Sequence, residues 1–147
     1  MNISFSATKE QFRARRKHVT RRLDKSLHLY HLKPGTILTA IEKAQGLKKG
    51  EHVVRMGEIV VLEVGREPLD HIIKSNQRGI PENIRKIYAT WTFPLETDLE
   101  GFPELAPSEF VAMFCKMNKC TPDTEVTRIL FDYMDGTAGE HKTGKRE

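Results

Sequence analysis

Cysteine is scarce in this sequence of 147 residues, which contains only Cys115 and Cys120. Two cysteines five positions apart match neither a disulfide framework nor a zinc ribbon. We therefore expect two reduced thiols, with Cys115 on the buried face of a helix, and we expect no metal and no cofactor. Tryptophan occurs once, as Trp91. Its aromatic neighbourhood is more typical of local core than of a platform on which a base stacks.

Long apolar runs are absent as well. No stretch approaches the roughly 20 apolar residues that a membrane-spanning helix needs. Residues 1–6 also lack the charged region followed by an apolar stretch that marks a signal peptide. We expect a cytoplasmic protein without a membrane partner. With 38% hydrophobic and 30% charged residues, a chain of this length forms one domain with its own core. We expect it to be a monomer.

Positive charge is concentrated near the N-terminus. Residues 9–25 contain eight Lys or Arg against Glu10 and Asp24, a surplus of +6 that exceeds the net charge of +4 of the whole chain. Such a patch on an otherwise balanced chain is expected of a phosphate or nucleic-acid binder, although a solvated basic helix face is the alternative. The cations that we assign to ligand binding are Arg13, Arg15, Arg16, Arg21, Arg22, Lys48 and Lys49.

Alternating and amphipathic patterns in the first half predict short strands around one helix. Residues 3–5 alternate and predict an opening strand, and Ser6 or Thr8 is placed to cap a helix that reaches about Arg16. Residues 18–23 and 36–43 predict two further strands. The loop 45–50, which carries Lys48 and Lys49, either extends the basic surface or is a solvated connection.

The second half predicts a long strand, a gap in the pattern and a final helix and strand. Residues 57–64 are the most strand-like stretch, and Pro68 suits the first turn of a helix that reaches about Lys74. Residues 75–97 have the least pattern, apart from a helical candidate at 82–88. Together with the C-terminal pattern, this indicates a small β-barrel or an α+β domain.

The C-terminal third begins with a helix opened by Pro107. Its stripe of Phe110, Met113, Phe114 and Met117 has helical spacing, and we assign it to the core rather than to a cofactor site. Residues 126–133 alternate and predict a closing strand. From residue 135 onward the chain has no apolar pattern that can form a core, and we expect 135–147 to be disordered.

Six motifs in order along residues 2–133 resemble the ASCH domain family. They are Ile3-Ser4-Phe5-Ser6, the Arg-Arg-Lys-x-Val-Thr-Arg-Arg run at 15–22, Leu32-Lys33-Pro34-Gly35, Arg66-Glu67-Pro68-Leu69, Glu100-Gly101-Phe102-Pro103 and Val126-Thr127-Arg128-Ile129. The resemblance implies an α+β fold over residues 1–134, a small PUA-like mixed β-barrel with flanking helices. Residues 75–97 have the character of an insertion into that fold.

The resemblance also implies a function. PUA-like domains commonly bind RNA, and ASCH members are linked to RNA binding, ribonuclease action and deacylation of N(4)-acetylcytidine. In the deacylase branch, a lysine, a threonine three residues later and a distant glutamate form the catalytic set. The matching residues in this chain are Lys17 and Thr20, with Glu100 as the glutamate and Glu104 as the competing choice.

The chemistry of such a set requires a neutral lysine. The usual lysine pKa of about 10.4 must fall, and both desolvation and neighbouring cations lower it. A neutral Lys17 can take the proton of the Thr20 hydroxyl, which then attacks an acyl carbon. Glu100 protonates the leaving amine or orients the lysine. In a straight strand these two residues point to opposite faces, so they meet only if Lys17 ends the helix or the chain bends at 18–19.

Simpler roles remain open for the same residues. Lys17 could contact a phosphate, and the Thr20 hydroxyl could bond to backbone. His18 is expected to be an exposed loop histidine, although a ribonuclease could use it together with Lys17 and Glu100. We rank the binding of RNA or a modified nucleoside in a basic cleft first. An amidohydrolase acting on an acylated cytidine is second, and a ribonuclease is third.

Overall fold

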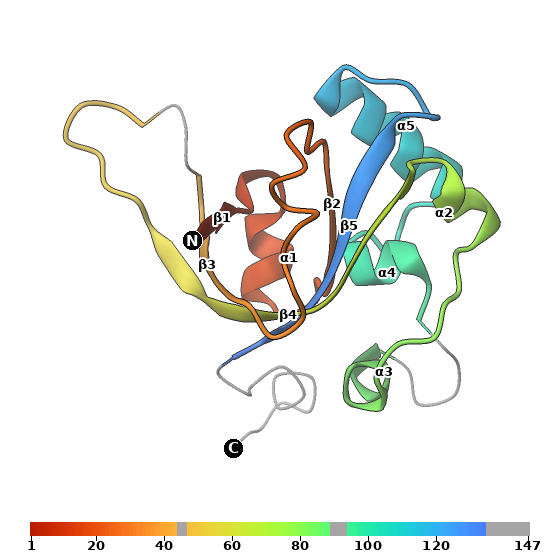
Figure 1. Cartoon of the computed structure of the whole chain (residues 1–147), viewed down its shortest axis with the longest axis horizontal. Coiled ribbons are helices and arrows are strands. Elements are labelled where there is room, and N and C mark those ends of the chain that lie inside the picture. The colour runs from red at the N-terminus through yellow and green to blue at the C-terminus, as the bar shows by residue number, and fades with distance from the viewer. Residues whose placement is uncertain (44–46, 89–93, 135–147) are drawn as a thin grey trace.

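A computed structural model shows that the chain folds into one five-stranded sheet with helices beside it (Figure 1). The structure describes residues 1–43, 47–88 and 94–134, with the backbone alone at 87 and 88. The elements in order are β1 (Asn2–Ser4), a 3-10 helix (Ser6–Thr8), α1 (Lys9–Arg13), β2 (Val19–Arg22), β3 (Ile37–Ile41), β4 (Arg55–Pro68), α2 (His71–Lys74), α3 (Glu82–Tyr88), α4 (Glu96–Glu100), α5 (Pro107–Asn118) and β5 (Glu125–Tyr133).

The strands follow the order β1-β3-β4-β5-β2 across the sheet. β1 is parallel to β3, and the other three pairings are antiparallel. β1 and β2 are the two edges, and no backbone pairing joins them in the described part of the chain. The predicted mixture of helices and strands is confirmed. The sheet, however, is open, so a closed barrel is not shown.

The long strand β4 curves across the sheet (Figure 1). It pairs with β3 near its start and with β5 as far as Pro68, and its register with β5 shifts between Val61 and Glu63. A bulge of this kind bends a strand and increases its twist. The bend helps to enclose the main core, whose most buried large side chains are Phe5, Phe12, Leu38, Ile59 and Phe131.

A second group of buried side chains lies where α2, α4 and α5 gather beside β2 and β5 (Figure 1). Leu69 and Ile72 from the α2 region meet Phe110, Val111 and Phe114 from α5. The stripe predicted for 107–118 is therefore half right. Phe110 and Phe114 are buried in this core, but Met113 is only partly buried and Met117 is 55% exposed.

Several predicted boundaries differ from the observed ones. The first helix ends at Arg13 instead of reaching Arg16, and Arg15 then takes a positive φ of 60°, which breaks the helical path. Pro68 is the last residue of β4 and does not open a helix. The amide of Leu69 still donates to the Thr124 carbonyl, and the helix α2 begins only at His71. Cys115, expected to be buried, is half-buried.

The predictions for residues 75–97 have different outcomes along the stretch. The helical candidate at 82–88 is confirmed as α3. The start of α4, which had no predicted counterpart, lies at the end of this stretch. Trp91 and the tail 135–147 lie outside the described residues. Within the described part of the chain, no helix has the length and apolarity to cross a membrane.

Candidate active site

Lys17 lies buried just before β2, and both ends of the residue are held. Its Nζ donates to Glu100 Oε1 at 2.9 Å and to the Glu100 carbonyl at 2.8 Å. Its own carbonyl accepts from the Tyr133 hydroxyl at 2.5 Å. The next amide, that of His18, donates to the Leu99 carbonyl at 2.7 Å. These bonds fasten residues 17–18 to both α4 and β5, so the Lys17 side chain stays 2% exposed.

Thr20 and Arg22 lie on the same face of β2, because side chains two apart in a strand point the same way. Arg22 Nε donates to Thr20 Oγ1 at 2.9 Å, and Arg22 Nη2 donates to the Ser4 carbonyl at 2.6 Å. The second bond spans the two edges of the sheet. Thr20 Oγ1 makes no hydrogen bond to backbone among the described residues, so the alternative role considered for its hydroxyl is not the observed one.

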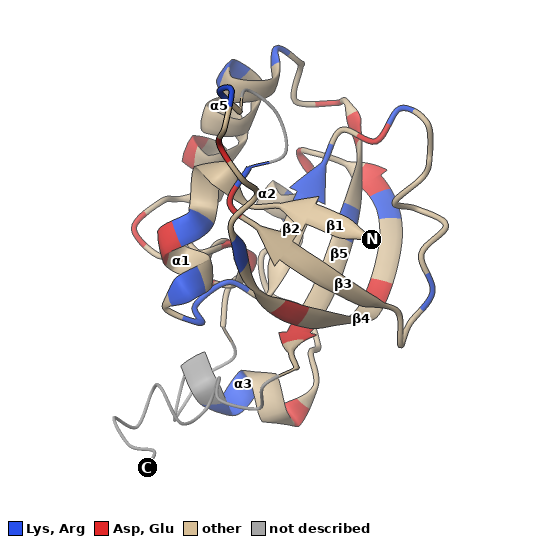
Figure 2. Cartoon of the chain, turned by 90° about the vertical axis from the view of Figure 1, so that its left-hand side faces the viewer, with Lys and Arg blue, Asp and Glu red and all other residues tan. Residues whose placement is uncertain are grey.

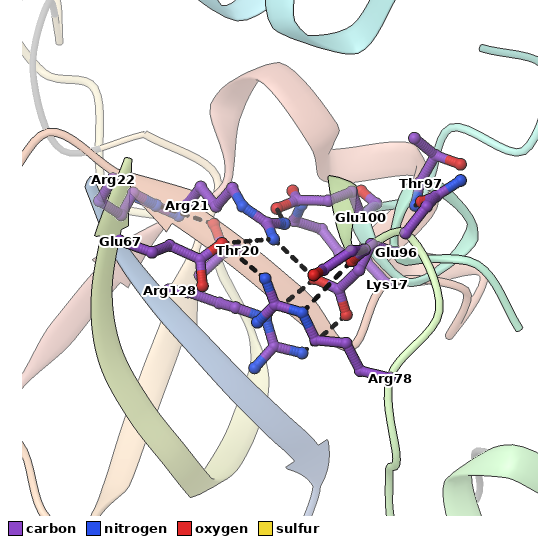
Figure 3. A network of polar contacts seen from close by, with 12 residues as sticks. Lys17, Thr20, Arg21, Arg22, Glu67, Arg78, Glu96, Thr97, Glu100 and Arg128 are labelled. Atoms are coloured by element: carbon purple, nitrogen blue, oxygen red, sulfur yellow. Dashed lines mark hydrogen bonds and ion pairs between the residues drawn. The ribbon is translucent and has the colours of Figure 1, made fainter. Parts of the chain in front are cut away.

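Helix α4 supplies two carboxylates to the same region. Glu96 and Glu100 are four residues apart, so they lie on one face of the helix. Arg21 of β2 reaches both, with Nη2 2.7 Å from Glu96 Oε1 and Nη1 2.7 Å from Glu100 Oε2. Glu100 thus offers one oxygen to Arg21 and the other to Lys17 (Figure 3).

Further ion pairs extend from Arg21 and Glu96. Arg128 stands opposite Arg21 in the β2–β5 register and binds Glu96 through Nε at 2.9 Å and Nη2 at 2.7 Å. Glu67 accepts from Arg21 at 3.1 Å and from Arg78 at 2.9 Å. We call the whole set the buried charge network, although its outermost member, Glu63, is exposed; its members are Lys17, Arg21, Glu63, Glu67, Arg78, Glu96, Glu100 and Arg128.

A cavity of about 290 Å³ opens beside this network, and we call it the site cavity. Its polar wall consists of Lys17, Thr20, Arg21, Arg22 and Glu100. Its apolar wall consists of Phe102, Phe110, Met113, Phe114 and Met117. Residues 4–8 and Asn118 complete the lining. The volume is near the lower end of the roughly 300–1,000 Å³ that small-molecule pockets occupy, and a lining that combines apolar side chains with a few polar groups is typical of them.

Burial shifts the pKa of two cations on the polar wall, Lys17 and Arg22. It lowers the pKa of Lys17, although the charge and hydrogen bond of Glu100 oppose the change and the charges of Arg22 and Arg21 add to it. It also lowers the pKa of Arg22 to about 10, against the opposing charge of Glu100. Both shifts make proton loss from these cations easier than in water.

The pKa of Glu96 is lowered, which means that its charged carboxylate is stabilised. Burial by itself raises the pKa of Glu96, but the hydrogen bonds and charges of Arg128 and Arg21 outweigh it and lower the pKa to about 2. Glu96 is therefore a permanent anion at neutral pH. It neutralises part of the charge that the arginines bring into the interior.

The structure brings together the three residues of the predicted catalytic set. Lys17, Thr20 and Glu100 all line the site cavity. Glu104, the competing glutamate, is exposed and does not line it. Lys17 lies outside β2, which begins at Val19, and it lines the same cavity as Thr20.

His18 is not the exposed loop residue that was expected. Its ring is completely buried, stacked on Phe131 and edge-on to Tyr133, with Nε2 3.6 Å from Asp132 Oδ1. It does not line the site cavity. A ribonuclease that uses His18 together with Lys17 and Glu100 on one phosphate therefore has no support in this geometry.

The seven cations assigned to ligand binding separate into an exposed group of four, a pair at the site cavity, and Arg15. Arg13, Arg16, Lys48 and Lys49 are exposed, and Arg13 pairs with Glu42 at 2.5 Å. Arg15 lies over the Tyr133 ring with 4.7 Å between its guanidinium carbon and the ring centre. Arg21 and Arg22 face the site cavity instead. Figure 2 shows basic and acidic segments of the ribbon interspersed along the chain.

Two parts of the site were missed in the sequence. Glu96 has no counterpart among the predicted site residues, although its spacing of four from Glu100 was a readable signal for one helix face. The stripe on α5 was assigned to core alone, yet Phe110, Met113, Phe114 and Met117 also form the apolar wall. The described residues contain no group of three or more His, Cys, Asp or Glu placed to hold a metal ion.

Comparison with known proteins adds little to this geometry. No family model matches the chain, and no curated protein matches it. Among solved structures, it is similar to the crystal structure of protein EF3133 from Enterococcus faecalis V583, which carries the family name DUF984. The TM-score is 0.41 and the identity 14%, over 81% of this chain and 61% of the other. The chain thus spans less than two thirds of that protein, and a likeness of this level assigns neither fold family nor function.

Proposed function

We propose that the chain binds an acylated nucleoside of the N(4)-acetylcytidine type in the site cavity and hydrolyses its amide bond. The observation that carries this proposal is the convergence of Lys17, Thr20 and Glu100 on one cavity of about 290 Å³. The Thr20 hydroxyl accepts a hydrogen bond from Arg22 and donates to no acceptor in the described part of the chain. Its hydrogen is therefore available to a base.

Lys17 lines the same cavity as Thr20 and has the environment that such a base needs. Burial favours its neutral amine, and Glu100 Oε1, 2.9 Å away, is placed to accept the proton that the ammonium loses. The neutral amine takes the proton of Thr20 while Thr20 Oγ1 forms a bond to the acyl carbon. The tetrahedral oxyanion then collapses, the C–N bond breaks, and the departing nitrogen receives the proton from Lys17.

Water completes the reaction on the acyl ester of Thr20. Lys17 takes a proton from the water as its oxygen attacks the acyl carbon, and the C–O bond to Thr20 breaks. Thr20 recovers its proton, and a carboxylic acid leaves. The products are the free amine of the base and the acid. The apolar residues of α5 and Phe102, which line the same cavity, offer the flat base an apolar surface.

The test is to incubate the chain with N(4)-acetylcytidine and measure cytidine. Turnover is expected from the wild type and from Glu104→Gln, because Glu104 is exposed and outside the cavity. Turnover is expected to be lost in Lys17→Ala and Thr20→Ala. The proposal fails if the wild type releases no cytidine, or if both variants release it at the wild-type rate.

Binding of a longer RNA is the second candidate, and the exposed cations Arg13, Arg16, Lys48 and Lys49 favour it. A chain that contacts several phosphates loses affinity steeply with salt, whereas nucleoside turnover barely responds. We expect RNA affinity at low salt to fall when these four are changed to alanine. A matched set of exposed lysines, Lys33, Lys74, Lys86 and Lys119, is the control. Equal affinity of the two sets would reject this candidate.

The fold that we propose for this function is the PUA-like barrel of the ASCH domain. The motifs at 3–6, 15–22 and 126–129 coincide with the start of the sheet, β2 and β5, which surround the site. The bond from Arg22 to the Ser4 carbonyl already links the two edge strands that a barrel would close. An experimental structure in which β1 and β2 lie far apart would count against this assignment.

A further inference from the structure

Arg22 differs from the other cations around the site cavity, because it forms no ion pair with a carboxylate in the described part of the chain. The buried charge network contains four cations and four carboxylates, namely Lys17, Arg21, Arg78 and Arg128 against Glu63, Glu67, Glu96 and Glu100. Arg22 is a fifth cation, and no ion pair includes it among the described residues. Its hydrogen-bond partners in the described part of the chain are a hydroxyl and a carbonyl, both uncharged.

Arg22 lines the site cavity, so its charge lies where a bound ligand can meet it. The guanidinium lies against the ring of Phe5 at 5.1 Å and lines the site cavity. Burial depresses its pKa to about 10, which leaves it charged at neutral pH. A partly buried cation without an anion is costly, and a site that keeps one usually offers it to negative charge in a ligand or a reaction.

A second observation agrees with an excess of donors at this wall. Arg21 Nε is buried and has no acceptor in the described part of the chain. The two terminal nitrogens of Arg21 donate hydrogen bonds to Glu67, Glu96 and Glu100. The wall that Arg21 and Arg22 share therefore has hydrogen-bond donors to spare and lacks acceptors, which suits an oxygen anion.

We infer that Arg22 is a catalytic residue that stabilises the oxyanion formed when Thr20 attacks an acyl carbon. The inference rests on the proposed function. Arg22 Nε is 2.9 Å from Thr20 Oγ1, so the carbon bonded to that oxygen lies beside the guanidinium. As the Thr20 oxygen bonds to the carbon, the electron pair of the carbonyl moves to its oxygen. That oxygen becomes an anion until the C–N bond breaks.

Two donor groups of Arg22 remain for this anion. Nε is used by Thr20 and one hydrogen of Nη2 by the Ser4 carbonyl, which leaves Nη1 and the other hydrogen of Nη2. The Ser4 bond and the Phe5 ring fix the plane of the guanidinium before any substrate binds. Donors fixed in this way lower a barrier without a reorganisation cost.

The inference is tested with Arg22→Gln and Arg22→Lys, with Arg55→Gln as the control. Arg55 is exposed and outside the cavity, so its variant removes the same charge elsewhere. We expect Arg22→Gln to lower kcat about 100-fold with a smaller change in KM, as loss of one oxyanion donor does. Arg22→Lys keeps the charge but not the fixed fork of donors, and an intermediate kcat is expected. Arg55→Gln is expected to match the wild type.

A probe that needs no turnover separates this inference from the proposed function. Methylboronic acid forms a tetrahedral, negatively charged adduct with a hydroxyl, and its binding is measured by calorimetry. Binding is expected in the wild type and Arg55→Gln and is expected to be lost in Arg22→Gln and Thr20→Val. Circular dichroism and thermal unfolding establish whether each variant is folded. If Arg22→Gln is unfolded, Arg22→Lys is compared with the wild type in its place.

Each outcome decides something. If the wild type releases cytidine and Arg22→Gln has an undiminished kcat, the oxyanion role falls and the proposed function stands. If the wild type releases no cytidine but binds the boronic acid only with Arg22 present, the oxyanion site stands and the substrate falls. Absence of both turnover and boronic acid binding overturns both.

Discussion

Lys17 and Glu100, 83 positions apart in the sequence, form a buried pair with Nζ 2.9 Å from Oε1. The other Glu100 oxygen is held by Arg21 at 2.7 Å. The carboxylate therefore has a fixed orientation toward the lysine. The lysine has two opposing influences on its pKa, because burial lowers it and this carboxylate raises it.

The first prediction concerns the pH dependence of turnover. If Lys17 acts as the base, kcat/KM rises with pH as the ammonium becomes neutral. Changing Glu100 to Gln removes the negative charge that raises the pKa of Lys17, so the rising limb moves to lower pH while the rate itself falls. The measurement is kcat/KM against pH for Glu100→Gln and for Glu104→Gln. A limb that stays in place in Glu100→Gln would mean that another group titrates.

The second prediction concerns stability in acid. Glu96 has a pKa of about 2 in the folded chain against its usual 4.5. Between these values the unfolded chain holds more protons, so the free energy of unfolding falls as the pH falls from about 4.5 toward 2. The total change is about 3 kcal/mol. Urea unfolding at several pH values measures it, and Glu96→Gln is expected to lose this part of the acid sensitivity.

Glu109→Gln is the matched control for Glu96→Gln, because it removes a carboxylate that is exposed on α5. That variant is expected to keep the wild-type slope between pH 4.5 and 2. An identical slope in Glu96→Gln and Glu109→Gln would show that Glu96 is not the group responsible.

The third prediction concerns Arg21 as the centre of the buried charge network. Its terminal nitrogens bind Glu67, Glu96 and Glu100. Truncation to alanine leaves buried carboxylates with fewer partners and is expected to cost about 3–5 kcal/mol of stability. Chemical unfolding measures the loss, with Arg55→Ala as the exposed control. A loss no larger than that of Arg55→Ala would show that the network does not depend on Arg21.

The fourth prediction concerns the glycine that follows α4. Gly101 has a φ of +97°, and a Cβ there would lie 2.8 Å from the Gln11 Cβ. Gly35 has a similar φ of +94° with no atom within 4 Å of such a Cβ. Gly35→Ala is therefore expected to cost about 1–2 kcal/mol from backbone strain alone. Gly101→Ala is expected to cost more and to lower turnover, because α4 must move away from α1 and carries Glu100 with it.

Thermal unfolding and kcat/KM of these two glycine variants are compared directly. The larger loss of stability and activity belongs to Gly101→Ala if the close approach to Gln11 positions α4. Equal losses in both variants would leave backbone strain as the whole effect.

The fifth prediction concerns the apolar wall. Met117 lines the site cavity yet is 55% exposed, so its truncation changes the cavity with little effect on stability. Met117→Ala is expected to raise KM roughly fivefold, equivalent to about 1 kcal/mol of lost apolar contact, with kcat nearly unchanged. Met134→Ala removes an exposed methionine outside the cavity and serves as the control. Equal KM values for the two variants would argue against ligand contact with α5.

The local patterns of the sequence predicted most of the elements. Alternation indicated β5 and the core of β4, and the Pro107 start indicated α5. The charge cluster was misread in part because counting cations cannot show which are paired. Arg21 faces Glu96 and Glu100 across long-range contacts that no local pattern contains. Five residues of helix, as in α4, also give too short a pattern for periodicity to reveal.

The proposed catalytic set follows from family resemblance rather than from local sequence patterns. Lys17 and Thr20 line one cavity, and the choice of Glu100 over Glu104 depends on where α4 packs. Burial reversed the expectation for His18, whose ring joins Phe131 and Tyr133 in the interior. The unpaired charge of Arg22 also becomes visible only when every partner in space is known.

The measurement that tests the central claim most directly is a double-variant cycle on N(4)-acetylcytidine hydrolysis. Residues that act as one catalytic unit lose activity together, so their losses do not multiply. The kcat/KM of wild type, Lys17→Met, Thr20→Val and the double variant is measured under one condition. We predict cytidine release by the wild type and a double variant no slower than the slower single variant. Absence of release by the wild type, or a double loss equal to the product of the two single losses, would contradict the account.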